Sequence, residues 1–357
     1  MLNKNEFFNY IKDHVTGYLP PVFENGRIEL VEMVKDNDIK LTSINIVKQG
    51  ENSCPAIYLD SLYECYTDGK KLDECVADVA DIRIERDVSD LVKKLSYLDY
   101  STARKNLMIR MCDPEWNKER LLQAVHTMHG DYAAIYYLRI EQDNVNFATE
   151  LIKPEMLKSW GVSEEQLHVD AMAAERKRCP ILCNITDIID EMIFGIEPIN
   201  MFLENESNIP GVMENPLYVL TNADRMNGAS LILQEDLLEQ IGNIIKTDYY
   251  ILPSSCHQVM ILPAFTEIDI TAMTEIVKDI NVTEVEPQDR FSEKVQYYSR
   301  ETKTLENAFR RETRLEAEKE KQAGKSIKER ITSAKKEVSA VPTAKSGQRT
   351  KSMEAEI

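Results

Sequence analysis

Long apolar runs are missing from the sequence. The longest stretch without a formal charge, residues 249–266, contains Pro253, Pro263 and a polar centre that is costly in lipid. We therefore expect two buried strands joined by a turn here, and no membrane span. Residues 1–15 also lack an apolar run after a basic start, so we expect no secretory signal.

Basic residues are too few to balance the acidic ones. The chain has 43 Lys and Arg against 61 Asp and Glu, a net charge of −18. Because like charge repels phosphate backbones and anionic lipid, we expect no general nucleic-acid binding and no membrane docking. The content of 43% hydrophobic and 29% charged residues excludes wholesale disorder and fibrous classes. The length of 357 residues predicts about two domains and an extension.

Motifs of several enzyme classes are also missing. There is no GxGxxG after a predicted strand, no Walker A motif, no HExxH and no GxSxG. Nucleotide-binding, zinc-protease and α/β-hydrolase functions are therefore unsupported, and we predict no cofactor. The seven cysteines are odd in number and irregularly spaced, which favours reduced thiols in a cytoplasmic protein.

The patterns that are present predict an α+β protein with short, mostly antiparallel sheets and packed helices. Residues 27–36 and 39–49 alternate in polarity around an Asp-Asn-Asp turn, which predicts an antiparallel hairpin. Further strands are expected at residues 106–112, 131–144, 216–222, 229–234, 249–252 and 259–262, and helices at residues 5–18, 72–95, 115–125, 163–178, 187–194, 237–245 and 267–279.

The charge changes sign toward the C-terminus. Residues 301–357 hold 14 basic and 10 acidic residues, a net charge of +4, whereas residues 1–300 carry a net charge of −22. A helix with so few large apolar residues is not held by packing on a core. We therefore expect an N-terminal α+β region (1–114), a second α+β region (115–288), an exposed charged helix (289–338) and a disordered tail (339–357). The first two regions could also form one continuous fold.

Four segments carry a resemblance to a known family. They are the early hairpin followed by PAIYLDSLYECY, the strand DYAAIYYLRI, the helix start WGVSEEQL, and PLYVLTNADRMNGASLIL followed by DYYILPSSCHQVMILP. Together they resemble an uncharacterised family of Firmicutes, the domain of unknown function 5688, over residues 1–285. The resemblance implies no known activity, but it implies a bacterial cytoplasmic protein. Gln258 stands where many members of that family have Glu.

The polar loop inside the last predicted hairpin is the first candidate site. Ser254, Ser255, Cys256 and His257 interrupt apolar residues, and a hydroxyl or thiol beside an imidazole can act as nucleophile and base. Asp224 would orient the imidazole if the two turns meet in space. The alternative, which we favour, is a tight turn in which the hydroxyls satisfy backbone groups and His257 caps the hairpin.

The turn TNADRMNG is a candidate surface for a partner. It contains Asn222, Arg225 and Asn227, and Gln258 follows the first candidate loop. The alternative is a turn-rich connector between two core strands, which we prefer.

Two residue pairs resemble metal ligands only weakly. His126 and His129 could share a metal if they lay on one helix face, but we interpret them as a polar connector. Three residues lie between Cys179 and Cys183, which fits neither a zinc knuckle nor a thioredoxin motif, so we expect a buried strand or helix entry. We predict no metal site.

Two classes of function remain. We favour a non-catalytic interaction protein that binds an unidentified protein partner through its C-terminal helix. This hypothesis predicts an exposed apolar patch of several hundred Å², or a tail that becomes ordered with a partner. The alternative is an undescribed hydrolase or transferase that uses Ser255 or Cys256 with His257. It predicts His257 in a pocket, within hydrogen-bond reach of a hydroxyl or thiol, with an acid behind it.

Overall fold

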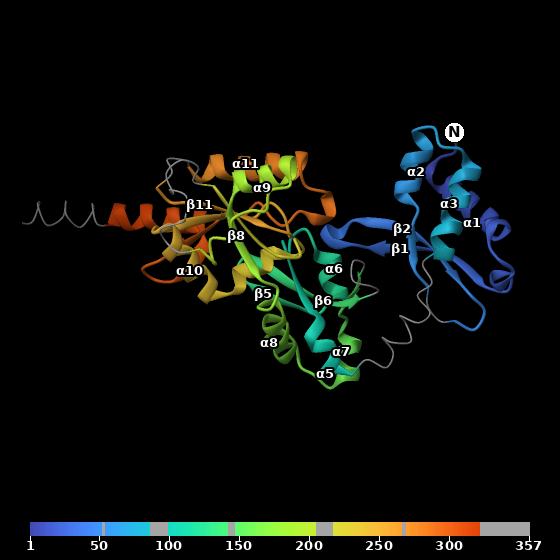
Figure 1. Ribbon diagram of the computed structural model, residues 1–357, viewed down its shortest axis with the longest axis horizontal. Helices are drawn as coiled ribbons and strands as arrows, with labels where there is room; N and C mark the ends of the chain where they lie inside the picture. Colours follow the sequence, from blue (N-terminus) through green and yellow to red (C-terminus); the bar gives the residue numbers. More distant parts are fainter. Residues whose placement is uncertain (52–53, 86–98, 142–146, 205–216, 266–268, 322–357) are drawn as a thin grey trace, which may run out of the picture. The chain divides into compact units, whose positions relative to one another are not determined.

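The computed structural model describes residues 1–321 apart from 52–53, 86–98, 142–146, 205–216 and 266–268 (Figure 1). The chain divides into a compact unit, Met1–Ala308, and a second unit, Phe309–Ile357. The compact unit contains three antiparallel sheets, which confirms the predicted α+β class.

The first sheet contains the predicted hairpin. Its strands are β1 (Arg27–Val34), β2 (Lys40–Val47) and β3 (Ala56–Tyr58), and α1 (Lys4–His14), α2 (Asp60–Thr67) and α3 (Leu72–Glu85) accompany it. Strands β1 and β2 pair in register from Arg27 with Val47 to Val34 with Lys40. Phe7 and Ile11 of α1 and Val76 of α3 are buried in a common core with Ile44 of β2. The part of the expected 72–95 helix that follows Glu85 lies outside the described residues.

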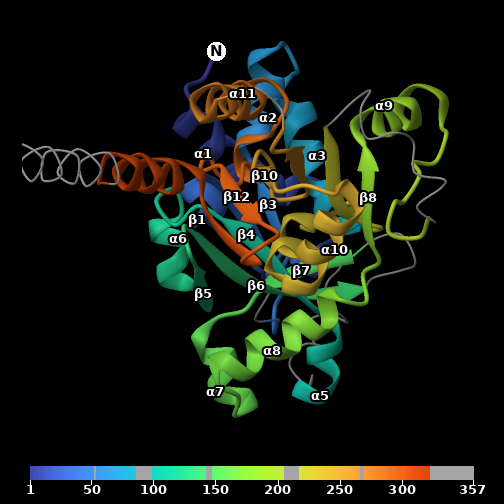
Figure 2. The ribbon, with the colours of Figure 1, turned by 90° about the vertical axis from the view of Figure 1, so that its left-hand side faces the viewer.

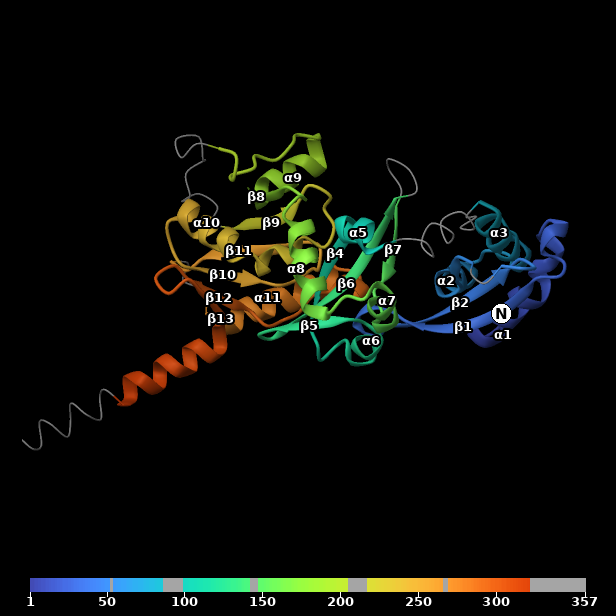
Figure 3. The ribbon, with the colours of Figure 1, turned by 90° about the horizontal axis from the view of Figure 1, so that it is seen from below.

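The second sheet is built around a long central strand. Its strands are β4 (Leu107–Cys112), β5 (His126–His129), β6 (Tyr132–Glu141) and β7 (Phe147–Leu151) (Figure 3). Strand β6 pairs with all three of the others. The helices here are α5 (Tyr100–Ala103), α6 (Lys118–Gln123), α7 (Pro154–Trp160) and α8 (Glu164–Glu175). The hydroxyl of Ser163 accepts a hydrogen bond from the Gln166 backbone amide, so the predicted start of α8 is confirmed.

The third sheet has six strands in the order β13-β12-β10-β11-β9-β8. They are β8 (Pro180–Asn184), β9 (Tyr218–Asn222), β10 (Tyr249–Leu252), β11 (Val259–Pro263), β12 (Gln296–Ser299) and β13 (Thr304–Asn307), and the helices are α9 (Ile185–Phe194), α10 (Glu235–Ile245) and α11 (Ile270–Thr283). Ile251 shares a core with α10, whereas its neighbour Leu252 shares a core with α11. Alternation along β10 therefore covers the two faces of the sheet with different helices, as Figure 1 shows.

The strand predicted at residues 229–234 is wrong. Gly228–Leu233 form a buried 3-10 helix, η5. Its amides do not join a ladder, because Gly228 and Ala229 donate to the carbonyls of His257 and Cys256. A Cβ at Gly228 would lie 2.5 Å from the His257 carbonyl oxygen, so this close approach requires glycine. A short apolar run does not by itself distinguish a strand from a buried helical turn.

The polar connector expected at His126–His129 is also wrong, because these residues form β5. Their partners are residues of β6, from Ile135 to Tyr132. The helix predicted before them is shorter than expected and covers only Lys118–Gln123.

Residues 289–307 are not part of an exposed helix as predicted. They supply β12 and β13, which complete the third sheet. Val295 and Tyr297 pack into the core that contains α11. The helical residues 309–321 belong to the second unit, and the rest of the predicted charged helix and the tail lie outside the described residues.

Candidate functional site

Arg110 of β4 is the centre of a polar cluster that joins all three sheets. Its Nε lies 2.9 Å from Asp36 Oδ2, and its Nη2 lies 2.9 Å from Asp289 Oδ1. Its Nη1 donates to Asn227 Oδ1 at 3.4 Å, and Nη2 also donates to the Gln288 carbonyl. The Arg110 side chain is only 12% exposed, so these acceptors replace the water that the guanidinium loses on folding. We call Arg110 and the groups bound to it the arginine hub.

The tip of the β1–β2 hairpin supplies the first acid of the hub. Asp36 Oδ1 accepts hydrogen bonds from Arg120 Nε at 3.0 Å and from the Tyr137 hydroxyl at 2.7 Å. One carboxylate thus neutralises two largely buried arginines, Arg110 and Arg120. The two arginines come from β4 and α6, so this contact ties the hairpin to the second sheet.

The next two residues of the tip anchor it further. Asn37 exchanges hydrogen bonds with Asn117, and its side-chain amide donates to the carbonyls of Pro287 and Arg290. Asp38 accepts from the backbone amides of Glu119 and Arg120, at the start of α6. The helix therefore receives its N-terminal cap from a residue about 80 positions earlier in the chain.

His257 has partners for both of its ring nitrogens. Nδ1 accepts a hydrogen bond from the Asn227 backbone amide at 3.1 Å. Nε2 lies 3.3 Å from Asp289 Oδ1. These partners place the proton on Nε2, so the imidazole has no lone pair free to accept a proton from a nucleophile.

Asp289 accepts hydrogen bonds from both the His257 imidazole and the Arg110 guanidinium. Burial alone would raise its pKa, but hydrogen bonds from His257 and Arg110 outweigh burial and lower the pKa to about 2. The carboxylate therefore stays ionised through the physiological range. It contacts His257 as the orienting acid of a triad would, but through Nε2, the nitrogen that faces the nucleophile in a serine protease triad.

The predicted nucleophiles are buried. Cys256 is 1% exposed, and burial raises the pKa of its thiol to about 12. Such a thiol is protonated at neutral pH and is a poor nucleophile. Ser254 and Ser255 are also buried, and the Ser255 hydroxyl accepts from the His257 backbone amide. Within the described residues, no hydroxyl or thiol bonds to the His257 ring.

Asp224 does not orient His257. It accepts from Arg139 Nη1 and Arg178 Nη2 at 2.9 Å each, and Asp289 takes the place that we expected for it. The sequence gives no local sign of Asp289 or Arg110, because both are distant from the loop along the chain and neither belongs to a motif.

The turn residues proposed for partner binding have internal partners. Asn222 is buried and closes its turn through hydrogen bonds with the backbone of Met226. Arg225 pairs with Glu191 of α9, and Asn227 binds His257 and Arg110. Gln258 is half-buried and directly precedes β11.

Cys256, His257 and Asp289 place one ligand atom each within 4.8 Å of one another, a spacing that a cation could bridge. The surroundings do not fit a metal. Coordination through Nε2 would put a proton on Nδ1, which would then face the Asn227 amide hydrogen. The Arg110 guanidinium on Asp289 would also repel a cation.

The two weak ligand pairs do not form metal sites either. His126 and His129 lie three apart on a strand, which places them on opposite faces. Cys183 is buried in β8, whereas Cys179 is exposed just before it.

Helix α9 exposes an apolar surface. None of its residues is buried, although most of them are apolar. Met192, Ile193 and Phe194 are 81%, 65% and 68% exposed, and Ile189 lies one turn earlier. The helix follows β8, the edge strand of the third sheet (Figure 2). We call the side chains of Ile189, Met192, Ile193 and Phe194 the α9 surface.

The protein is therefore of the α+β class, and the charged side chains of its arginine hub form ion pairs and hydrogen bonds with one another. The chain matches the model of a family of unknown function (DUF5688) over residues 4–300, and it belongs to that family. No curated protein and no solved structure matches it.

Proposed function

We propose that this protein is a non-catalytic interaction protein that binds an amphipathic helical segment of another protein on the α9 surface. The exposure of Met192, Ile193 and Phe194 on one helix supports this proposal most directly. Large side chains scattered singly over a surface need no explanation, but a contiguous group on one helix marks an interaction site.

The charges beside the surface favour a basic partner. All charged residues of α9 are acidic, namely Asp187, Asp190 and Glu191, of which Glu191 is already paired with Arg225. If a second copy of the chain bound through its own α9 surface, the acidic residues of the two helices would face and repel each other. A helix with an apolar face flanked by Lys and Arg would bury the α9 surface and meet the acids.

Two synthetic helical peptides test this proposal with the full-length protein. They share one apolar face and differ only in whether Lys or Glu flanks it. We expect the Lys peptide to bind the wild-type protein, and we expect this binding to weaken with added salt. The same peptide should not bind the double variant Met192→Gln/Ile193→Gln. Fluorescence anisotropy of labelled peptide gives the dissociation constants.

Leu122→Gln is the matched control, because Leu122 is 86% exposed on a different helix. It should leave peptide binding unchanged. Equal binding of the Lys and Glu peptides, or equal binding to wild type and to the α9 double variant, would contradict the proposal.

A second contact through the charged C-terminal helix stays part of this proposal. Residues 309–321 are helical and almost all exposed, and they carry charges of both signs. Comparing full-length protein with residues 1–308 in the same peptide assay separates this contact from the α9 surface.

The alternative is a hydrolase or transferase that uses Ser255 or Cys256 with His257. The approach of Cys256, His257 and Asp289 supports it, whereas the engaged ring nitrogens count against it. Thiol labelling of the native protein near pH 8 distinguishes the two classes. We expect the exposed Cys65 and Cys179 to react, and Cys256 to react only after unfolding.

We also propose a bacterial origin, within Firmicutes, and a cytoplasmic location. All seven cysteines lie among the described residues and are free thiols, which supports a reducing compartment. The net charge of −18 supports the absence of general nucleic-acid binding. Over the described residues, every helix is too short or too polar to cross a membrane.

A further inference from the structure

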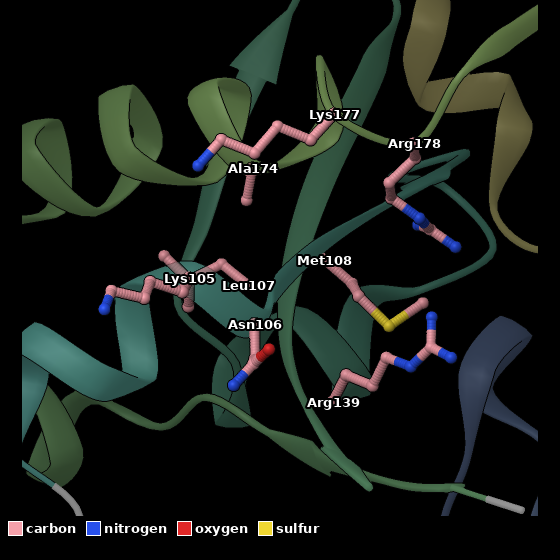
Figure 4. Close-up of a pocket in the computed structure, with 8 residues that line it drawn as sticks. All are labelled: Lys105, Asn106, Leu107, Met108, Arg139, Ala174, Lys177 and Arg178. Atoms are coloured by element: carbon pink, nitrogen blue, oxygen red, sulfur yellow. The ribbon is translucent and has the colours of Figure 1, made fainter. Parts of the chain in front are cut away.

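A small pocket between the second sheet and α8 is lined by cations. Lys105 and Asn106 belong to the 3-10 turn Arg104–Asn106 before β4, Arg139 belongs to β6, and Lys177 and Arg178 follow α8. Figure 4 shows their side chains around the cavity, whose volume is about 130 Å³. Every charged side chain of the lining is basic. This is unexpected in a stretch, residues 1–300, whose net charge is −22.

The arginine side of the pocket already holds an anionic group. Arg139 Nη1 and Arg178 Nη2 each lie 2.9 Å from the same oxygen, Asp224 Oδ2. Two guanidinium groups thus converge on one carboxylate oxygen that is partly open to solvent.

The lysine side has no such counter-charge. Lys105 and Lys177 are exposed, and neither forms an ion pair with the described residues. In Figure 4 their ammonium groups lie on the side of the pocket away from the two guanidinium groups. Cations gathered around one cavity repel each other unless an anion lies between them.

The end of α8 explains only part of this arrangement. Lys177 and Arg178 follow the helix C-terminus, where cations complement the negative end of the helix dipole. Lys105 and Arg139 come from other elements and have no such reason to face the cavity. Arg139 and Arg178 are already paired with Asp224, and Arg178 also with Glu175, so Lys105 and Lys177 are the cations of the lining that indicate a site for an anion.

We propose that this pocket binds a phosphate group, either as inorganic phosphate or as the end of a phosphate monoester. A dianion matches the two unpaired lysines better than a single carboxylate does, and the Asn106 amide can donate to a third oxygen. Pockets for drug-sized ligands usually measure about 300–1,000 Å³, so this one has room for the phosphate but not for a large substituent. The substituent of an ester would extend into solvent.

Calorimetric titration of the full-length protein tests the proposal, with inorganic phosphate and phenyl phosphate as probes in a chloride buffer of constant ionic strength. Both should bind wild type. Lys105→Ala and Lys177→Ala should each weaken binding about tenfold, and the double variant about a hundredfold. Tighter binding of phenyl phosphate than of inorganic phosphate would point to an ester as the natural ligand. Equal affinities of the two probes would point to free phosphate.

Lys153→Ala/Lys158→Ala is the control, because both residues are exposed lysines of α7 or its cap. It should bind phosphate like wild type. Absence of phosphate binding by wild type, equal weakening in both double variants, or undiminished binding by Lys105→Ala/Lys177→Ala would each overturn the proposal.

Asp224→Asn is an independent test, because it should raise the affinity for phosphate whereas the lysine variants should lower it. It removes the negative charge of the carboxylate that Arg139 and Arg178 share, so less negative charge opposes an anion at the pocket, while Arg178 keeps its ion pair with Glu175. We expect phosphate to bind severalfold more tightly. Unchanged or weaker binding in this variant, with its fold intact by circular dichroism, would contradict an anion site at this cavity.

Discussion

Asp36 is the residue whose loss should cost most stability. It lies 2.9 Å from Arg110 and 3.0 Å from Arg120, and all three side chains are at most 14% exposed. Asp36→Ala leaves the buried Arg120 without its carboxylate partner and leaves Arg110 with Asp289 alone, so we expect the free energy of unfolding to fall by about 3–5 kcal/mol. Urea unfolding followed by circular dichroism measures the change.

Asp236→Ala provides the comparison. Asp236 also pairs with an arginine, Arg176, at 3.0 Å, but both side chains are 56% exposed. We expect a loss of about 1 kcal/mol or less from this pair and from the position of Asp236 at the start of α10. Similar losses in the two variants would mean that the arginine hub is not a buried structural centre.

Asp289 should make stability depend on pH. Its folded pKa of about 2 lies below the ordinary value of 3.8, so the ionised form stabilises the folded state. This contribution is present above about pH 4 and is lost as the pH falls from there toward 2. Asp289→Asn should therefore lower the free energy of unfolding by about 2 kcal/mol at pH 7, and the difference from wild type should shrink as the pH approaches 3.

Urea titrations at several pH values check this expectation. Asp13 is exposed on α1, and Asp13→Asn should change stability by less than about 0.5 kcal/mol at pH 7 and at pH 3. A difference for Asp289→Asn that stays constant with pH would show that the carboxylate does not hold its charge for His257 and Arg110.

The site could be predicted only in part from single residues. The polar loop at Cys256 and His257 stands out because it interrupts apolar strands. Its partners do not, because Asp36 looks like ordinary turn chemistry and Arg110 like one cation in a strand. Asp289, Arg110 and Asp36 meet His257 or one another only through the pairing of distant elements, which one sequence does not contain.

At the scale of one element, Ser163 should account for the start of α8. Its hydroxyl accepts from the Gln166 amide, which would otherwise lack a partner at the helix end. We expect Ser163→Ala to lower the free energy of unfolding by about 1 kcal/mol. Ser163→Asp should keep most of the stability, because aspartate caps equally well. Equal losses in both variants would argue against capping, and urea midpoints measure them.

Elements with a strong local signal were predictable, and elements defined by their surroundings were not. The β1–β2 hairpin and α10 have clear periodicity. Helix η5 has the same apolar composition as a strand, but the carbonyls of the His257 loop bind its first amides. Strands β12 and β13 have only four residues each and contain polar positions, so tertiary packing rather than pattern determines them.

At the scale of the whole molecule, residue 308 should be the usable C-terminal limit. Residues 1–308 keep β12 and β13 and the core that Val295 and Tyr297 complete. We expect this truncation to have the same urea midpoint as the full chain. Residues 1–290 lack both strands, which leaves β10 as an open edge beside exposed apolar side chains.

We therefore expect residues 1–290 to aggregate or to lose cooperative unfolding. Size-exclusion chromatography and urea unfolding of the two truncations provide the comparison. A soluble 1–290 protein with a normal midpoint would show that β12 and β13 are dispensable. The family match ends at residue 300, between these two strands, so a protein cut at that limit is also expected to be defective.

The anchoring of the hairpin tip has a consequence for synthesis on the ribosome. Asn37 bonds to the carbonyls of Pro287 and Arg290, which are 250 and 253 residues further along the chain. At roughly 5–20 residues per second, about 10 to 50 seconds pass between the emergence of the tip and that of its last partners. During most of this interval only residues 110–137 can hold the tip, so the nascent chain acquires its full set of tip contacts only after Arg290 has emerged.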